Sequence, residues 1–359
     1  MPVRQTALIM AAMVAAAPIA PVHAQLKLEP VVDNLPLGSR PGNPTYEMPA
    51  GQRLISPFGE RPVFSPDGRR IAFIGKSYGD AFEYDLATGR LRNLTAHMAH
   101  EGFLRVHYLH DGSFLLLGPH VPAKTREETR FKNIELFWLD ASASMPPVPL
   151  GITVFEGLAT SRSSNRIAWA EIDRSAPGAA GGMPTATTLK TGQVVVANGT
   201  ARLADVQTVV RTTDCPVEAQ DFLPGDTGLT MPCYHLSPTS AGPITEVLSV
   251  DFASKKITRY PTPPRLYGEV EGIFPDGKRT LVECSGDRAA GMDLCVLELK
   301  PVNPAYQRLT RIMDYGRWKY GNPVVSPDGR FIASSVGSAD VLEAGMGQGI
   351  VLIDLSTVK

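Results

Sequence analysis

Residues 62–95 constrain the fold most, because four short β-type runs follow one another there with turn signals between them. The runs cover 62–65, 70–75, 81–86 and 90–95, and Pro66-Asp67-Gly68 joins the first two. Asp-Gly between hydrophobic runs is a strong hairpin signal, because Gly adopts positive φ without a Cβ clash. Four antiparallel strands in one short segment form a sheet with two open faces, which becomes stable by stacking on copies of itself.

Five further copies of this pattern follow along the chain, starting near positions 101, 156, 218, 271 and 322. The last copy supplies three strands, and residues 52–55 (QRLI) resemble residues 307–310 (QRLT), the fourth strand of the preceding copy. We expect this N-terminal strand to complete the last sheet, since a closed ring leaves no free sheet edge. The predicted fold is all-β, a six-bladed β-propeller whose ring is closed by an N-terminal strand that completes the last blade.

The repeat FSPDGRRIAF…YDLATGRLRNLT resembles the TolB-like propeller repeat, also called the WD40-like or PD40 repeat. Its best matches are FSPDG at 64–68, FPDG at 274–277 and VSPDG at 325–329. The resemblance implies the fold and leaves the function open, because such repeats occur in periplasmic scaffolds, in peptidase propeller domains and in carbohydrate-active proteins. The predicted organisation is a signal peptide (1–24), an extended N-terminal arm (25–50) and a TolB-like propeller (51–359).

The first 24 residues have the features of a secretory signal peptide. Arg4 supplies the positive charge, residues 7–17 are apolar, and Val22-His23-Ala24 is a small-residue cleavage site. An uncleaved anchor is disfavoured because the apolar run is too short to span a bilayer. We therefore expect a periplasmic or secreted protein with no membrane span.

The net charge and the cysteines agree with an exported protein. The formal net charge of −1 gives no reason to expect a nucleic-acid partner, and we expect a monomer. Cys284 and Cys295 flank one hairpin loop, and Cys215 and Cys233 flank another. These spacings predict two local disulfides, 215–233 and 284–295, and the alternative is four buried thiols.

Glutamate recurs just before the first strand of five copies. The positions are Glu60, Glu101, Glu156, Glu218 and Glu271, and the sixth copy has Asn322. First strands line the central channel of a propeller, so equivalent positions would form a ring at one mouth. Like charges about 4 Å apart repel by ~4 kcal/mol at an effective dielectric near 20, so such a ring needs a cation, a basic partner or protonated members.

Two interpretations of this ring stay open. Glu and Asn oxygens are hard ligands that suit Ca²⁺. The first interpretation is therefore a calcium site formed by Glu101, Glu156, Glu218, Glu271 and Asn322. In the second, these carboxylates accept backbone hydrogen bonds or pair with arginines such as Arg61.

Loops that enter the first strands supply candidate ligand-binding residues. Aromatic rings that alternate with cations suit stacking on a sugar and pairing with a carboxylate. The candidates are His97, His100, Tyr267, Arg317, Trp318 and Lys319. If the protein is an enzyme, His100, Tyr315 and Arg317 are the candidate catalytic residues. The alternative for each is solvent exposure or packing between blades.

No H-E-x-x-H, P-loop or Rossmann glycine motif is present. Two functions remain, and the sequence leaves open whether the protein is an enzyme. One is a propeller that binds a small molecule, glycan or protein at the acidic mouth of its channel. The other is a carbohydrate-directed lyase or hydrolase, calcium-dependent, that uses the same mouth.

Overall fold

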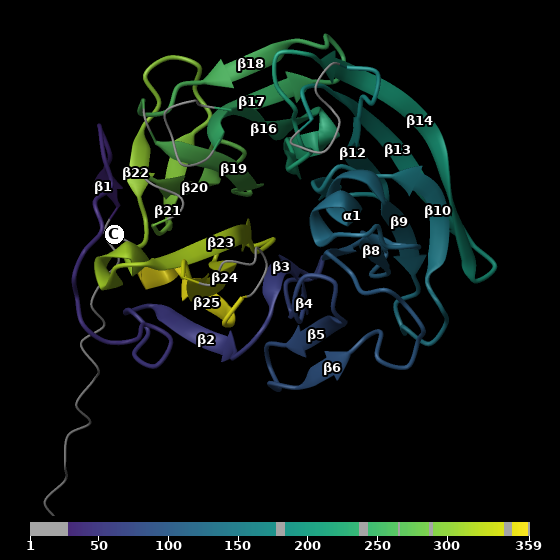
Figure 1. The fold of residues 1–359 in the computed structure, drawn as a ribbon, viewed down its shortest axis with the longest axis horizontal. Coiled ribbons are helices and arrows are strands. Elements are labelled where there is room, and N and C mark those ends of the chain that lie inside the picture. Colours follow the sequence, from purple (N-terminus) through teal and green to yellow (C-terminus); the bar gives the residue numbers. More distant parts are fainter. Residues whose placement is uncertain are drawn as a thin grey trace, which may run out of the picture.

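The computed structural model describes residues 28–176, 184–236, 243–264, 266–286, 290–340 and 347–357. Their strands form six antiparallel sheets that follow one another around a central axis (Figure 1). This arrangement confirms the prediction of an all-β, six-bladed propeller. No helix in these ranges is long and apolar enough to cross a membrane. The predicted signal peptide lies outside the described residues.

We number the blades by the order of their inner strands. Blades 1 to 3 contain, from the inner to the outer strand, β3 (Glu60–Phe64), β4 (Arg70–Ile74), β5 (Ala81–Asp85) and β6 (Leu91–Asn93); β7 (Arg105–Tyr108), β8 (Phe114–Pro119), β9 (Ile134–Leu139) and β10 (Val148–Thr153); and β11 (Leu158–Thr160), β12 (Arg166–Ile172), β13 (Thr187–Ala197) and β14 (Thr200–Thr212). A short helix, α1 (Arg126–Lys132), lies between β8 and β9.

Blades 4 to 6 follow the same order. They contain β15 (Asp221–Phe222), β16 (Gly228–Leu236), β17 (Pro243–Asp251) and β18 (Ile257–Tyr260); β19 (Tyr267–Ile273), β20 (Arg279–Ser285), β21 (Asp293–Glu298), β22 (Tyr306–Arg308) and β1 (Glu29–Pro30); and β23 (Trp318–Val325), β24 (Phe331–Ser338), β25 (Ile350–Asp354) and β2 (Gln52–Ser56). Short 3₁₀ turns are η1 (Pro224–Asp226), η2 (Ile312–Tyr315) and η3 (Leu355–Thr357).

The Ser-Pro-Asp-Gly segments form the turn between the first two strands of their blades. In blade 1, Gly68 has a φ of 69°, and its backbone N–H donates to the Ser65 carbonyl at 2.8 Å. The Ser65 hydroxyl accepts a hydrogen bond from the Arg70 backbone N–H at 2.9 Å and donates to Asp67 at 2.6 Å. The same contacts recur at Ser326 and Asp328 in blade 6. The motif therefore sets both the turn and the register of the hairpin.

The N-terminal segment extends two blades. β2 pairs antiparallel with β25 and is the outer strand of blade 6, as Gln52 lies opposite Ile353. β1 pairs with β22 and adds a fifth strand to blade 5. Val31 and Leu35, just beyond β1, are buried in the core shared by blades 5 and 6. The segment expected as an extended arm thus packs along these blades.

The core consists of apolar layers between neighbouring sheets. One layer places Leu115 and Leu117 of blade 2 against Trp169 of blade 3. Trp169 is fully buried. Burying a large apolar side chain contributes on the order of 1.5–3 kcal/mol, so blade stacking, rather than any single blade, carries the stability.

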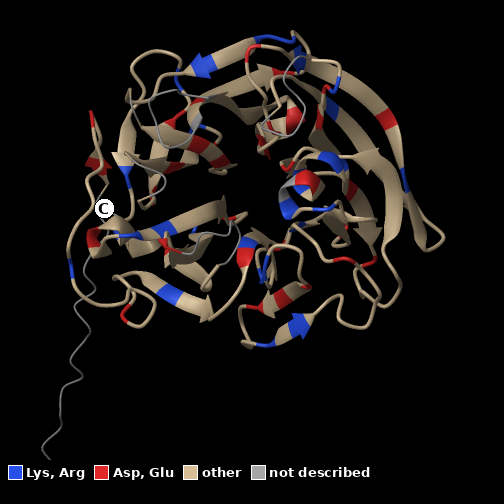
Figure 2. Ribbon diagram, in the orientation of Figure 1, with Lys and Arg blue, Asp and Glu red and all other residues tan. Residues whose placement is uncertain are grey.

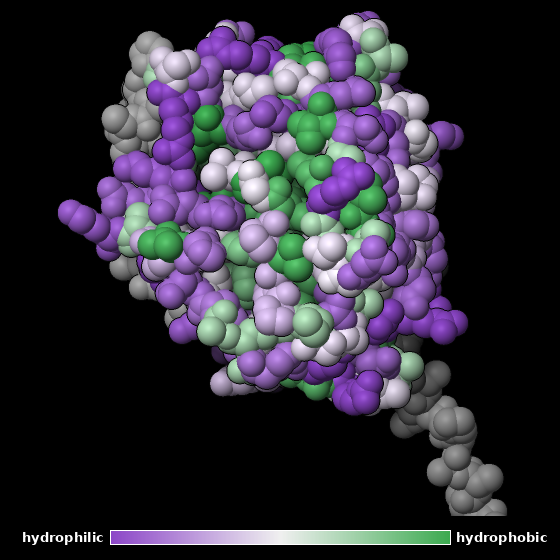
Figure 3. Space-filling model, turned by 90° about the vertical axis from the view of Figure 1, so that its right-hand side faces the viewer, coloured by the Kyte–Doolittle hydropathy of each residue, from purple (hydrophilic) through white to green (hydrophobic). Residues whose placement is uncertain are grey.

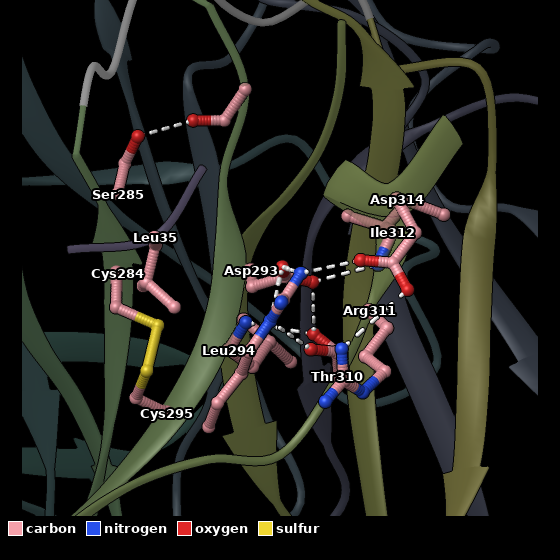
Figure 4. A network of polar contacts seen from close by, with 12 residues as sticks. Leu35, Cys284, Ser285, Asp293, Leu294, Cys295, Thr310, Arg311, Ile312 and Asp314 are labelled. Carbon is pink, nitrogen blue, oxygen red and sulfur yellow. Dashed lines mark hydrogen bonds and ion pairs between the residues drawn. A yellow bond between two sulfur atoms is a disulfide. The ribbon is translucent and has the colours of Figure 1, made fainter. Parts of the chain in front are cut away.

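Both predicted disulfides are present. Cys215 pairs with Cys233, with Cα atoms 5.5 Å apart, and Cys284 pairs with Cys295, with Cα atoms 5.8 Å apart. The second disulfide joins β20 to β21 and is buried (Figure 4).

Two segments contain structure that the sequence analysis does not assign. α1 occupies part of residues 119–133, and the Thr125 hydroxyl caps its start by accepting from the Glu128 N–H at 3.1 Å. β13 begins at Thr187, ahead of its valines at 194–196, and pairs with β14. The buried residues in its first half are two threonines and a leucine, so this half lacks a strong hydrophobic pattern.

Candidate functional site

The inner strands of all six blades surround a channel along the propeller axis. A cavity of about 260 Å³ is lined by residues of β3, β7, β11, β15, β19 and β23. A second cavity, of about 150 Å³, lies at the end where these strands begin, which we call the mouth. Arg61, Arg105 and Asn322 line both cavities and therefore stand where the two meet.

The structure buries four of the five predicted ring glutamates, Glu60, Glu156, Glu218 and Glu271. The prediction that Glu101 belongs to the ring is wrong, because this residue is exposed and lines a separate cleft beside Lys76 and Tyr78. Blade 2 begins its inner strand only at Arg105. The residues between them, Phe103 and Leu104, are buried, so the chain turns inward four positions later than the alignment of repeats assumes.

Two of the buried glutamates are paired with arginine. Glu60 accepts hydrogen bonds from Arg61 at 3.0 Å and from the Ser77 hydroxyl at 2.7 Å. Glu156 accepts from Arg130 of α1 at 2.5 Å. For these two positions the structure agrees with the alternative in which the carboxylates pair with arginine.

The closest group of carboxylates lies on blade 5. Glu269 and Glu271 of β19 and Glu283 of β20 each offer one oxygen, and these oxygens all lie within 4.8 Å of one another. Glu269 and Glu283 are directly opposite in the hairpin. The three residues are only 7%, 6% and 3% exposed. We call Glu269, Glu271 and Glu283 the carboxylate cluster.

Each member of the cluster has polar neighbours from other strands. Glu269 accepts from the Tyr234 hydroxyl at 2.6 Å and from the Tyr267 hydroxyl. Glu271 accepts from the Gln220 amide at 2.9 Å through one oxygen, whereas its other oxygen is buried without a hydrogen-bond partner. Glu283 accepts from the Asn322 backbone N–H at 2.5 Å. Asn322, a predicted metal ligand, thus contacts the cluster through its backbone.

Burial perturbs two of the acids predicted for the ring. It raises the pKa of Glu271 well above its usual value, and the charges of Glu283 and Glu269 raise it further. Burial and the charge of Glu269 raise the pKa of Glu218 to about 7. The fold therefore favours the neutral form of these two acids, or a bound cation, over an array of unpaired anions.

Cations face this acidic wall. Arg61, Arg105, Arg130 and Lys319 line the mouth cavity together with glutamates of blades 1, 3 and 5. Figure 2 shows the acidic segments of β19 and the basic segments of β3 and α1 around the propeller axis. The predicted acidic interior is therefore a mixed one, with acids concentrated on blade 5 and cations on blades 1, 2 and 6.

Tyr267 and Lys319 are the two predicted ligand-binding residues that lie at this site, one bonded to Glu269 and the other lining the cavity. His100 instead contacts Asp80 at 3.0 Å and accepts from the Gly102 N–H at 2.9 Å. The described lining of the two channel cavities does not include His97, His100, Tyr315, Arg317 or Trp318.

Each of these residues has another environment. His97 is exposed, and Arg317 is exposed and paired with Asp340. The Arg40 guanidinium covers the Tyr315 ring at 4.6 Å. Trp318 packs against the core of blades 5 and 6. None of these four residues belongs to the described lining of the two channel cavities.

Sequence reasoning missed Glu269, Glu283 and Arg105. The Glu269-x-Glu271 spacing carries a signal, since alternate strand residues share a face. Pairing the 274–277 turn with its flanking strands would then have placed Glu283 opposite Glu269.

No protein-family model matches the chain, and no curated protein is similar to it in sequence. Solved structures are similar in fold. An oligogalacturonate lyase in complex with manganese has a TM-score of 0.50 and 13% identity over 89% of this chain and 80% of that one. An oligogalacturonate lyase from Vibrio parahaemolyticus has a TM-score of 0.47 and 12% identity over 92% and 97%. TolB from Acinetobacter baumannii has a TM-score of 0.41 and 14% identity over 81% and 67%.

The architecture that the chain shares with these structures is the six-bladed β-propeller. At these sequence identities the likeness is one of fold. The function has to be argued from the channel.

Proposed function

We propose that this protein is an exported propeller that binds a small molecule or glycan at the channel mouth, with a divalent cation held by Glu269, Glu271 and Glu283. The observation that carries the proposal is the carboxylate cluster, whose oxygens lie within 4.8 Å of one another. Two unit charges at about that distance repel by ~3 kcal/mol at an effective dielectric near 20. A cation removes this repulsion and uses the buried Glu271 oxygen that has no partner.

The donors favour an oxygen-seeking metal. Three carboxylates are hard ligands, which suit Ca²⁺ or Mn²⁺ over softer ions. The oligogalacturonate lyase of similar fold is described in complex with manganese. A cation bound here would have open coordination positions toward the cavity, where a ligand hydroxyl or carboxylate could join it.

The second candidate function is a carbohydrate-directed lyase or hydrolase at the same mouth. The pKa of Glu218, raised to about 7, favours it, because a carboxyl that titrates near neutrality suits general acid-base catalysis. Glu218 is not among the described residues that line the two channel cavities. A group that cannot reach a ligand cannot transfer a proton to it directly, so binding is the better-supported function.

Export is part of the proposal. Two disulfides are typical of proteins from oxidising compartments, and the predicted signal peptide gives the route. A protein partner is less well supported, since hydrophobic residues are interspersed with hydrophilic ones on the face shown in Figure 3.

Thermal unfolding after chelation tests the cation. Wild-type protein should melt at a higher temperature when millimolar Ca²⁺ or Mn²⁺ is restored, and Glu271→Gln should lose this rise. Glu101→Gln is the matched control, because this exposed glutamate lies outside the cluster and should leave the rise intact. An unchanged metal-induced rise in Glu271→Gln would contradict the proposal.

A further inference from the structure

Arg105 is the first residue of β7, the inner strand of blade 2. Blade 2 lies across the ring from blade 5, which holds the carboxylate cluster (Figure 1). Arg105 is 8% exposed and lines both channel cavities. A guanidinium carries five N–H donors in a rigid plane. Burying such a group has a large desolvation cost unless its donors find acceptors.

No described residue accepts a hydrogen bond from Arg105, and its buried Nε has no partner. The Nε of Arg61 is also buried without a hydrogen-bond partner, but the terminal nitrogens of the neighbouring arginines are paired, unlike those of Arg105. Arg61 donates to Glu60 and Ser77, and Arg130 donates to Glu156. Arg105 is thus a buried cation at the meeting point of two cavities, and its donors are directed at the channel rather than at protein acceptors.

His107 strengthens this observation. It lies two residues further along β7, so its side chain shares the channel face with Arg105, and it lines the larger cavity. Its Nε2 is also buried without a hydrogen-bond partner. Burial and the charge of Arg105 lower the pKa of His107 to about 3, which keeps the ring neutral. A neutral imidazole beside a guanidinium offers one further hydrogen bond to a bound group.

We infer that Arg105 and His107 form a subsite that binds the oxyanion group, most simply a carboxylate, of a small acidic ligand inside the channel. The inference rests on the proposed function and specifies its ligand class. A planar guanidinium forms two parallel hydrogen bonds with a carboxylate, a geometry that other anions of similar size share in part.

The charges around the subsite fit this assignment. Arg105 lies close enough to Glu60, Glu218 and Glu271 for its charge to oppose the rise in their pKa values. Arg61 also lines the channel beside it. A ligand carboxylate at Arg105 lies opposite the cation proposed for the cluster. One end of an acidic ligand would then bind Arg105, and hydroxyl groups at its other end would bind the cation. Cation and anion should therefore bind with positive coupling.

Calorimetric titration of the full-length protein tests the subsite with four probes: D-glucuronate, D-glucose, acetate and inorganic phosphate, each with and without Ca²⁺. D-glucuronate should bind, and D-glucose, which lacks the carboxylate, should bind at least tenfold more weakly. Acetate reports the carboxylate alone, and phosphate distinguishes a general oxyanion site from a carboxylate site.

Variants then assign the binding to Arg105. Arg105→Gln should weaken D-glucuronate binding by about 10- to 100-fold, the range expected for charge-assisted hydrogen bonds. Arg105→Lys keeps the charge but not the planar fork and should fall between Gln and wild type. Arg330→Gln, which removes an exposed arginine 3.7 Å from Asp354, is the matched control and should bind as wild type does.

Three outcomes overturn the inference: no binding of any anion, equal binding of D-glucose and D-glucuronate, or wild-type affinity in folded Arg105→Gln. In the last case Arg105 only balances the carboxylate cluster. The rise in melting temperature with Ca²⁺ separates failure of this subsite from failure of the proposed function. A Ca²⁺ response without anion binding would remove the subsite alone, whereas anion binding without any Ca²⁺ response would remove the cation and leave the subsite.

Discussion

Two buried polar regions of this propeller have similar chemistry and opposite degrees of hydrogen-bond satisfaction. At the outer side of blade 5, Asp293 accepts from Arg308, from the Thr310 hydroxyl at 2.8 Å and from the Ile312 N–H at 2.7 Å (Figure 4). Arg308 also donates to the Thr310 carbonyl at 2.9 Å and to Asp314 at 3.1 Å. None of the described buried side-chain atoms of this network lacks a partner.

The channel holds more charge and satisfies it less completely. Glu271, Arg105 and His107, which all line the larger channel cavity, each have a buried atom without a partner. Buried polar groups in native proteins are nearly always hydrogen-bonded, so exceptions that share one cavity point to a missing ligand. The difference indicates that the Asp293 network maintains the fold, whereas the channel is arranged for something that binds there.

The largest expected effect comes from breaking the satisfied network. Asp293→Ala leaves Arg308 buried without its main partner and should lower the free energy of unfolding by about 3–5 kcal/mol. Denaturant unfolding with and without Ca²⁺ measures this. The loss should be the same in both conditions, and Asp314→Asn, at the exposed edge of the network, should cost much less. A loss of unfolding free energy below about 1 kcal/mol in Asp293→Ala would contradict the view that this network maintains the fold.

A smaller effect of opposite sign is expected in the channel. Glu271→Gln removes a buried charge whose pKa is raised by burial and by two neighbouring carboxylates. With a raised folded pKa, the ionised form destabilises the fold as pH rises above the unfolded value. In chelator at pH 8 the variant should therefore be more stable than wild type, by on the order of 1–3 kcal/mol. Denaturant midpoints compare the two proteins, and a destabilised variant would assign Glu271 to the fold.

The smallest effect should come from Glu218, whose pKa is raised to about 7 by burial and by the charge of Glu269. Its contribution to stability is present below the unfolded pKa, about 4.5, and is lost as pH rises toward 7. In chelator, Glu218→Gln should therefore flatten the fall in melting temperature between these pH values. A pH profile identical to that of wild type would show that burial does not perturb this acid.

Much of the fold could be predicted because it depends on local signals. The Asp67-Gly68 and Asp328-Gly329 turns place their hairpins without reference to the rest of the chain, and the cysteine spacings placed both disulfides. Helix α1 was missed because its single capping residue, Thr125, is a weak signal inside a charged loop.

The site could be predicted only in part. Repeat alignment predicted correctly that Glu156 and Glu271 lie at the channel, where they are buried. It could not show that Phe103 and Leu104 are buried ahead of β7, so that the inner strand of blade 2 starts only at Arg105 and Glu101 is exposed to solvent. The sequence analysis also proposed His100 as a ligand-binding and catalytic candidate, whereas its ring nitrogens contact Asp80 and the Gly102 backbone N–H.

The number of blades, their turns and the disulfide pairs could be predicted from the sequence, because these depend on residues that are close in the chain. Which charges meet depends on the closed ring. Glu269 faces Glu283 through a hairpin register, and Arg105 faces them from the opposite blade. Closing six sheets into a ring brings residues more than 150 positions apart into one cavity, where burial, rather than residue type, decides which charges find partners and which are left for a ligand.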